Sequence, residues 1–518
     1  MKLLLVLSHP GFLRLYDEVI ADLAGRGHHL HVGLENTRIN AQTMSVLEGL
    51  GGGVTYAGRV PARKDAYAGF ARALRRTADF AIYLHPHLAR ASGARERRGK
   101  LVAAPLRSLP GGRALRPGVT RFVLRAFLAL ERAIPSSAAA EDFVRAAAVD
   151  AVVVAPLVRD SGRQTDVVKA AQSLGVPTAV SVASWDNLTT KGLMRVQPDR
   201  VLVWNEAQAG ELREFHAFPG ERVIVTGAQP FDRWFGRTPR LHREAFSARV
   251  GLDPRAPWVL YTGSSPTIAR PDREAAFILE WVRALRESPD PAVRDVRVLV
   301  RPHPLSLGPW REAHLDHLGV TVWPRERTNQ AAEDTRADLF DSLYHSTAVV
   351  GVNTSAMIEA AIIGRPVHTL RVPGFARGQD QTAHFQHLLP ENGGFLRVAY
   401  SMDEHLRQLA EAVANPTIAD AANRRFVESF IRPWGLEHDC TPIVADAVEA
   451  VARTTPETEP PPVWAPLLRG VVGSLGTGGR VADARRRARK SGRRRARRLQ
   501  RRVRRSRRET GALLRRSG

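Results

Sequence analysis

The chain has 518 residues, of which 44% are hydrophobic, so it is long enough to bury large cores in two domains. Its formal charge of +24 is concentrated in residues 480–518, where 19 Arg or Lys stand against two acidic residues, which leaves an ordinary +7 for the other 479 residues. The single cysteine, Cys440, excludes an internal disulfide and a cysteine-based zinc site, and no apolar run reaches the roughly 18 residues of a membrane-spanning helix.

Strand patterns alternate with helical patterns through the first half of the chain. Residues 2–7 contain an apolar run of only five residues without a small-residue cleavage site, so we interpret them as a first strand and not as a signal peptide. Further runs of apolar and β-branched residues predict strands near 29–34, 150–155, 177–182, 200–204 and 222–226. This alternation predicts a parallel sheet covered by helices, in a Rossmann-like domain over residues 1–235.

An Arg-, Gly- and Pro-rich stretch at residues 92–118 interrupts the alternation, and an apolar and basic helix is predicted after it, near 119–134. We interpret the stretch as a basic surface loop, with a membrane-contacting insertion as the alternative. Neither interpretation gives it a role in a site.

A second alternation begins after a linker at residues 235–240. It predicts strands near 258–262, 296–301, 320–323, 348–352 and 367–370, followed by helices near 402–413, 417–430 and 440–452. We expect a second Rossmann-like domain over 236–455, a Pro- and Gly-rich linker over 456–479, and a disordered Arg-rich tail over 480–518. The fold class is therefore α/β, with two Rossmann-like domains facing a cleft.

Two strand ends in the second domain carry polar groups. The run Val-Leu-Val-Arg-Pro-His-Pro at 298–304 ends in His303, and Val-Val-Gly-Val-Asn-Thr-Ser at 349–355 ends in Asn353, Thr354 and Ser355. Ligands bind at the carboxyl ends of parallel strands, and the second run turns into a helix whose first N–H groups suit a phosphate. The alternative is that the Asn-Thr-Ser sequence is only a helix N-cap. The two motifs together favour a phosphate-binding site.

Two tandem Rossmann-like domains with such a site resemble the GT-B fold of nucleotide-sugar glycosyltransferases. Three segments, Ser-Trp-Asp-Asn-Leu-Thr-Thr-Lys-Gly at 184–192, Pro-Asp-Arg-Val at 198–201 and Val-Thr-Gly-Ala-Gln-Pro-Phe-Asp at 225–232, resemble in order and spacing the CDP-glycerol glycerophosphotransferase and capsule polysaccharide transferase group. The resemblance spans roughly residues 180–370, and the matching positions are Trp185, Lys191, Gly227, Asp232, His303, Pro304 and Ser355. Asp186 stands where that group has a histidine base, and Asn353-Thr354 replaces its Asp-Tyr.

The resemblance implies a role for each group of residues. The donor nucleotide and its phosphates would be bound by Arg301, His303, Ser264, Ser265, Asn353, Thr354, Ser355 and Glu359. Trp185, Asn187 and Lys191 would lie on the acceptor side. The general base would be Asp186 or His9; Asp186 is favoured because its neighbours match the motif, although Asp186-Asn187 is also a typical turn pair. For Glu359, a charge in the first helical turn is an equal alternative.

The chemistry implied is transfer of a glycosyl or polyol-phosphate group from a nucleotide-activated donor to a cell-envelope or surface polysaccharide acceptor. No Asp-x-Asp pair ends a strand and His residues lack metal-ligand spacing, so we expect a metal-independent enzyme without a cofactor. The alternatives are a CDP-glycerol-type glycerophosphotransferase, a non-hydrolysing UDP-sugar 2-epimerase, whose Asp-Ser-Gly-Gly strand end is absent, and a noncatalytic nucleic-acid-binding protein.

The Arg-rich tail at 480–518 predicts an anionic partner. An anionic membrane surface and nucleic acid would both neutralise its charge, but no aromatic residue is interleaved for base stacking, so we expect nucleic-acid binding to be nonspecific. A lipid-linked or polymer acceptor fits a membrane location. We therefore expect a cytoplasmic protein that lies peripherally on the inner face of the plasma membrane.

Overall fold

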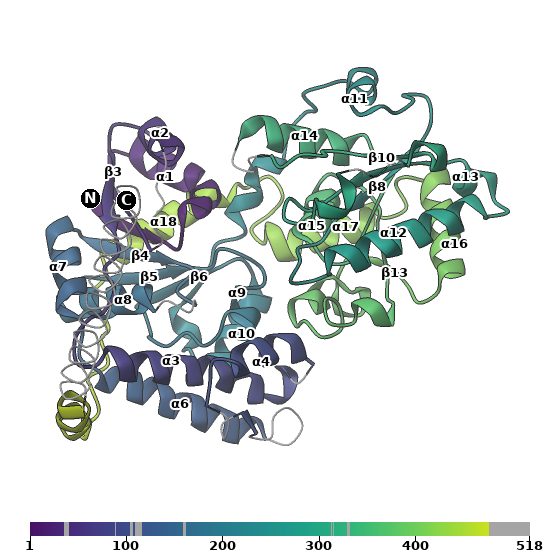
Figure 1. Cartoon of the computed structure of the whole chain (residues 1–518). Helices are drawn as coiled ribbons and strands as arrows, with labels where there is room; N and C mark the ends of the chain where they lie inside the picture. The colour runs from purple at the N-terminus through teal and green to yellow at the C-terminus, as the bar shows by residue number, and fades with distance from the viewer. Residues whose placement is uncertain are drawn as a thin grey trace, which may run out of the picture.

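The computed structural model of the chain describes residues 1–35, 41–88, 90–103, 107–108, 116–158, 162–311, 313, 315–328 and 332–475. It contains two parallel sheets, each with helices on both faces, which lie side by side (Figure 1). The predicted α/β fold with two Rossmann-like domains is confirmed. The Arg-rich tail at 480–518 and parts of the basic stretch at 92–118 fall outside the described residues.

The first sheet has seven parallel strands in the order β3-β2-β1-β4-β5-β6-β7. Their bounds are β1 Lys2–Leu7, β2 His29–Leu34, β3 Val54–Arg59, β4 Ala151–Ala155, β5 Thr178–Ser181, β6 Arg200–Val203 and β7 Val223–Val225. Its helices are α1 Asp17–Gly25, α2 Ala41–Gly49, α3 Ala68–Ala81, α4 Ser92–Gly99, α6 Pro117–Ala133, α7 Ala138–Ala147, α8 Arg163–Ser173, α9 Asn187–Thr190 and α10 Glu206–Phe215. The sequence predicted every strand except β3.

The second sheet has six parallel strands in the order β10-β9-β8-β11-β12-β13. Their bounds are β8 Trp258–Thr262, β9 Arg297–Arg301, β10 Val320–Val322, β11 Ala348–Gly351, β12 Val367–Leu370 and β13 Arg397–Ala399. Its helices are α11 Arg243–Val250, α12 Pro271–Arg286, α13 Pro291–Arg294, α14 Glu333–Tyr344, α15 Ser355–Ile362, α16 Met402–Ala414 and α17 Asp420–Phe426. Here the sequence predicted every strand except β13.

Alternation along each strand builds a core on both sides of each sheet. In β1, Leu3 and Leu5 join one buried cluster while Leu4 and Val6 join the cluster on the opposite face. The second sheet repeats this pattern, because Leu260 of β8 packs on one face and its neighbours in the strand pack on the other. Strands that are buried on both faces read as continuous apolar runs, which is why they could be recognised in the sequence.

After α17 the chain returns to the first domain. A turn of π-helix, Val427–Ile431, precedes α18, Cys440–Ala452, whose Val444, Val448 and Val451 belong to the core beneath the first sheet. Asp232 fixes this return, because its carboxylate accepts hydrogen bonds from the first backbone N–H groups of α18, at 3.0 Å and 2.7 Å. The last helix of the second alternation is thus packed on the first domain.

Candidate active site in the interdomain cleft

The strand order of the second sheet reverses at β8, and such a switch point is where ligands bind in parallel sheets. In the second sheet, β9 lies on one side of β8 and β11 on the other, so a crevice opens beyond the ends of β8 and β11. The turns after these strands are tied together by a 3.4 Å hydrogen bond from the Asn353 N–H to the Ser264 hydroxyl. Gly263 allows close contact here, since a Cβ at this position would lie 2.7 Å from the His303 backbone nitrogen. The predicted strand-end residues therefore do lie together.

His303 is oriented for donating a hydrogen bond into the crevice. Its Nδ1 accepts from the Leu305 N–H at 3.1 Å, which places the proton of the neutral ring on Nε2. Burial, together with the nearby Arg14 guanidinium, lowers the pKa of His303, so the ring is neutral at physiological pH. Arg301 lines the same cleft, and Asp338 and Ser342 hold its guanidinium at 2.8 Å and 2.9 Å.

The start of α15 offers hydroxyl groups to the same space. Thr354 occupies the N-cap position, but its side chain makes no capping hydrogen bond, and Thr354 and Ser355 both line the cleft. Asn353 lines it too, while its amide donates to the Gly378 carbonyl at 2.6 Å. The Thr354 hydroxyl therefore does not cap α15.

The first domain contributes the loop that follows β5. Asp186 accepts hydrogen bonds from the Lys191 ammonium at 3.0 Å, the Thr190 hydroxyl at 2.9 Å and the Asn187 amide at 3.2 Å. Burial alone would raise the pKa of Asp186, but Lys191, His384 and the hydrogen bonds outweigh it, so this pKa lies well below its ordinary value. An ionised carboxylate therefore faces the cleft.

Two aromatic rings from different domains meet beside Asp186. The Trp185 indole and the His384 imidazole pack edge to face with ring centroids 4.7 Å apart, and both rings line the cleft. His384 is both buried and cleft-lining. Burial lowers the pKa of His384 to about 4. Its Nε2 accepts from the Asn353 amide at 3.3 Å, so Nδ1 carries the proton, and the lone pair on Nε2 that a base would use is already engaged.

The cleft comprises two adjoining cavities of about 420 Å³ and 330 Å³, which share Ser184, Trp185, His303, Thr354 and Ser355. Sequence reasoning missed most of the cations around them, which are Arg14, Arg97, Arg98, Arg233, Arg336 and Arg377. Two of these come from the basic stretch at 92–118, because α4 carries them to the cleft. The walls of the cleft therefore suit an anionic ligand such as a diphosphate.

Glu359 differs from the cations around it. It lines the smaller cavity, and its Oε2 is buried without a hydrogen-bond partner among the described residues. Burial raises the pKa of Glu359 to about 7, although Arg14 and Arg301 act in the opposite direction. Its position on α15, one turn after Ser355, places both residues in the same wall.

Three predicted site residues are not among those that line the two cavities. His9 lies two residues after β1, and its Nδ1 accepts from the Gly11 N–H at 3.1 Å. Ser264 is fully buried and donates its backbone N–H to Glu274 at 2.9 Å. Asn187 accepts from the Ala183 N–H at 3.2 Å and so shapes the loop of Asp186. Ser265 and Lys191, by contrast, do line the larger cavity.

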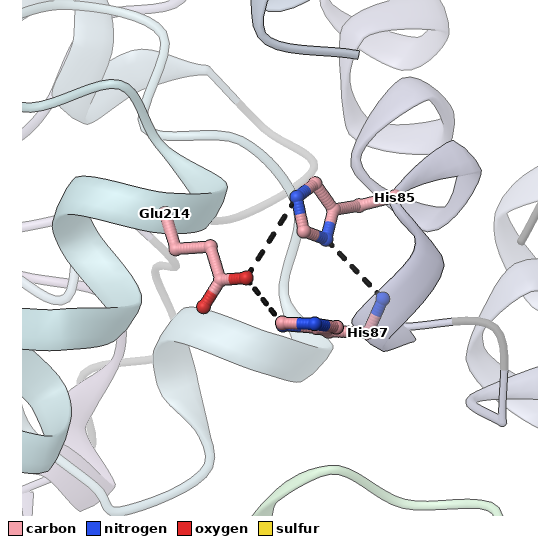
Figure 2. Close-up of side chains that lie close together, drawn as sticks. All are labelled: His85, His87 and Glu214. Carbon is pink, nitrogen blue, oxygen red and sulfur yellow. Dashed lines mark hydrogen bonds and ion pairs between the residues drawn. The ribbon is translucent and has the colours of Figure 1, made fainter. Parts of the chain in front are cut away.

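A separate group, His85, His87 and Glu214, brings three possible metal ligands within 4.8 Å of one another (Figure 2). The His87 backbone N–H donates to His85 Nδ1 at 3.3 Å, which places the proton of the neutral His85 ring on Nε2, the atom 3.8 Å from Glu214. A metal would have to displace that proton. None of the three residues lines the cleft.

No family model and no curated protein matches the sequence. Solved structures do resemble the fold: a UDP-GlcNAc 2-epimerase from Methanocaldococcus jannaschii has 12% identity and a TM-score of 0.48, with 87% of this chain and 100% of that chain covered. A glycosyltransferase from Rickettsia africae has 10% identity and a TM-score of 0.47, with 88% and 99% covered. WaaG, a glycosyltransferase involved in lipopolysaccharide biosynthesis, has 12% identity and a TM-score of 0.41, with 88% and 100% covered.

Proposed function

We propose that the chain is a GT-B transferase that moves a glycosyl or polyol-phosphate group from a nucleotide-activated donor to a cell-envelope or surface polysaccharide acceptor. One observation carries this proposal: hydroxyl, imidazole and guanidinium donors on the second domain face an ionised carboxylate on the first domain across a single cleft. Neither wall alone would support a transfer reaction.

The second domain would bind the donor. The His303 Nε2–H and the hydroxyls of Thr354 and Ser355 can donate hydrogen bonds to phosphate oxygens, and the start of α15 adds backbone N–H groups. These groups would stabilise the negative charge that grows on the leaving phosphate. The cleft arginines add an attractive field for the same charge.

The first domain would bind and activate the acceptor. The acceptor hydroxyl oxygen forms a bond to the anomeric carbon of the donor, or to its phosphorus in polyol-phosphate transfer, as the bond to the nucleotide leaving oxygen breaks. The hydroxyl proton passes to Asp186. Before the acceptor binds, Lys191 would keep the carboxylate in place through its hydrogen bond.

A membrane location belongs to the same proposal. The Arg-rich tail at 480–518 would hold the enzyme on an anionic membrane surface, close to a lipid-linked acceptor, with about 1 kcal/mol of attraction for each basic residue near the surface. Among the helices of the described residues, none is both long and apolar enough to cross a bilayer.

The test is a thermal-shift titration of the full chain with CDP, CMP, UDP, GDP and TDP, because a ligand that binds the native state raises its stability. We expect stabilisation by one of these nucleotides. His303→Ala should weaken the affinity for that nucleotide about tenfold. His317→Ala, at an exposed site on the η8 turn Asp316–Leu318, should leave the affinity unchanged. A cytidine nucleotide would favour the glycerophosphotransferase alternative, and C2 inversion of a UDP-sugar without an acceptor would favour the epimerase. No shift with any nucleotide would contradict the proposal.

A further inference from the structure

The segment that follows α18 packs against the first domain. Residues 465–475 are helical and lie next to the C-terminal end of α6, visible as the yellow-green helix at the lower left of Figure 1. Arg469 donates from Nε to the Ala133 carbonyl at 2.8 Å, and the Tyr67 hydroxyl donates to the Arg469 carbonyl at 3.2 Å. Ala465 and Val472 are buried on the inner side. The helix therefore has a defined orientation on the protein surface.

The outer side of this helix is also apolar. Trp464 is 41% exposed, Leu467 75%, Val471 52% and Leu475 72%. Steps of three, four and four residues place these side chains on one stripe of the helix. A helix with apolar residues on both sides is expected to be covered on both sides. Among the described residues, nothing covers the outer stripe, so it is suited to a partner.

An arginine-lined pocket lies beside the same segment. It has a volume of about 480 Å³, and its charged lining residues are Arg121, Arg125, Arg132, Arg213 and Glu459. The Arg132 guanidinium contacts the Glu459 carboxylate, which joins the pocket to the segment that carries the stripe. With four cations against one carboxylate, the pocket favours an anionic group such as a phosphate.

We propose that the apolar stripe formed by Trp464, Leu467, Val471 and Leu475 and the adjoining arginine pocket form a docking surface for an anionic phospholipid bilayer. The stripe would insert at the boundary between headgroups and acyl chains, and the arginines would contact headgroup phosphates. The sequence that follows, at 480–518, is itself strongly basic. Nucleic acid fits less well, because phosphate-backbone binding gives no role to exposed leucines. This surface is independent of the reaction that the cleft performs.

The experiment measures flotation of the full chain with vesicles of phosphatidylcholine containing about one third phosphatidylglycerol, at low and at high salt. We expect Leu467→Asp combined with Leu475→Asp to weaken binding about tenfold or more, with the larger loss at high salt, where charge attraction is screened. The matched control adds two aspartates at exposed apolar sites elsewhere, Val46→Asp and Ile418→Asp, and should bind as the unmodified chain does. Unchanged thermal midpoints would show that both variants are folded.

Brominated lipids give a second readout. They should quench tryptophan fluorescence in the unmodified chain and in Trp434→Phe, whose indole is 58% exposed elsewhere, but much less in Trp464→Phe. Vesicle binding by the double leucine variant equal to that of the unmodified chain would overturn the proposal. So would sedimentation showing that the stripe joins two copies of the chain while vesicles remain unbound, or binding to nucleic acid that the leucine changes abolish.

Discussion

At the scale of single residues, the Asp186 carboxylate is both ionised and held in place by hydrogen bonds. Three donors occupy its oxygens, and the Lys191 ammonium lies 3.0 Å from Oδ2. A carboxylate with such a low pKa accepts a proton only weakly in the ground state. In the proposed reaction it would become a stronger base when an acceptor hydroxyl displaces Lys191 and removes that stabilising contact. Binding of the acceptor in the cleft would thus raise the basicity of Asp186.

We expect Asp186→Asn to lower turnover by about 10²- to 10⁴-fold while nucleotide binding stays within about twofold, because the amide keeps the shape of the side chain and cannot take a proton. Steady-state rates and nucleotide titration would measure the two effects. Asp142→Asn, on the outer face of α7 with 75% of its side chain exposed, is the matched control. Turnover that survives in Asp186→Asn and is lost in His9→Ala would assign the base to His9.

The sequence could predict the site residues that sit at strand ends, such as His303 and Ser355, because strand runs and the residues after them are local signals. It could not predict Arg14 or Arg336. These come from elements without a motif, and only the packing of the two domains brings them to the cleft. Arg97 and Arg98 gave a signal, the basic stretch at 92–118, but its position against the cleft depends on how α4 packs.

At the scale of elements, most strands were predictable because they are buried on both faces. The two that were missed, β3 and β13, are edge strands. β3 is a partly exposed segment interrupted by Gly58, and β13, with the sequence Arg-Val-Ala, contains a single β-branched residue, so neither shows a continuous apolar run. The packing of α18 on the first domain was equally hidden, since an apolar helical pattern does not say which sheet it covers.

Asp232 offers a test of the return of α18 to the first domain. Its buried carboxylate accepts from the Cys440 and Thr441 N–H groups and from Arg432 at 3.1 Å. We expect Asp232→Ala to lower the free energy of unfolding by about 3 kcal/mol, because it removes a buried partner of the Arg432 guanidinium and leaves helix-terminal donors unpaired. Asp439→Ala removes another partner of Arg432, but that carboxylate is 63% exposed, so the loss should stay below about 1 kcal/mol. Urea denaturation measures both, and equal losses would contradict this role for Asp232.

At the scale of the whole molecule, folding buries ionisable groups with opposite pH dependence. His405 is fully buried under the second sheet, where its Nε2 accepts from the Trp281 indole at 2.9 Å, and burial lowers the pKa of His405 to about 4. Burial raises the pKa of Glu359 to about 7. Between its ordinary pKa and its pKa in the folded chain, each group is charged in the unfolded state and neutral in the native state. Over that pH range each group therefore lowers the free energy of unfolding.

The two groups should therefore respond to pH with opposite signs. Below pH 6.5 the unfolded chain protonates His405 and the native state does not, so the unmodified chain should lose up to about 3 kcal/mol relative to His405→Gln as pH falls from 6.5 to 4. Above pH 4.5 the unfolded chain ionises Glu359, so the unmodified chain should lose a similar amount relative to Glu359→Gln as pH rises from 4.5 to 7. Urea unfolding of the three proteins across this range measures both differences. The contributions of the many other titrating groups cancel in the difference in unfolding free energy between the unmodified chain and each variant. If that difference did not change with pH, the substituted group would have the same pKa in the folded and unfolded states.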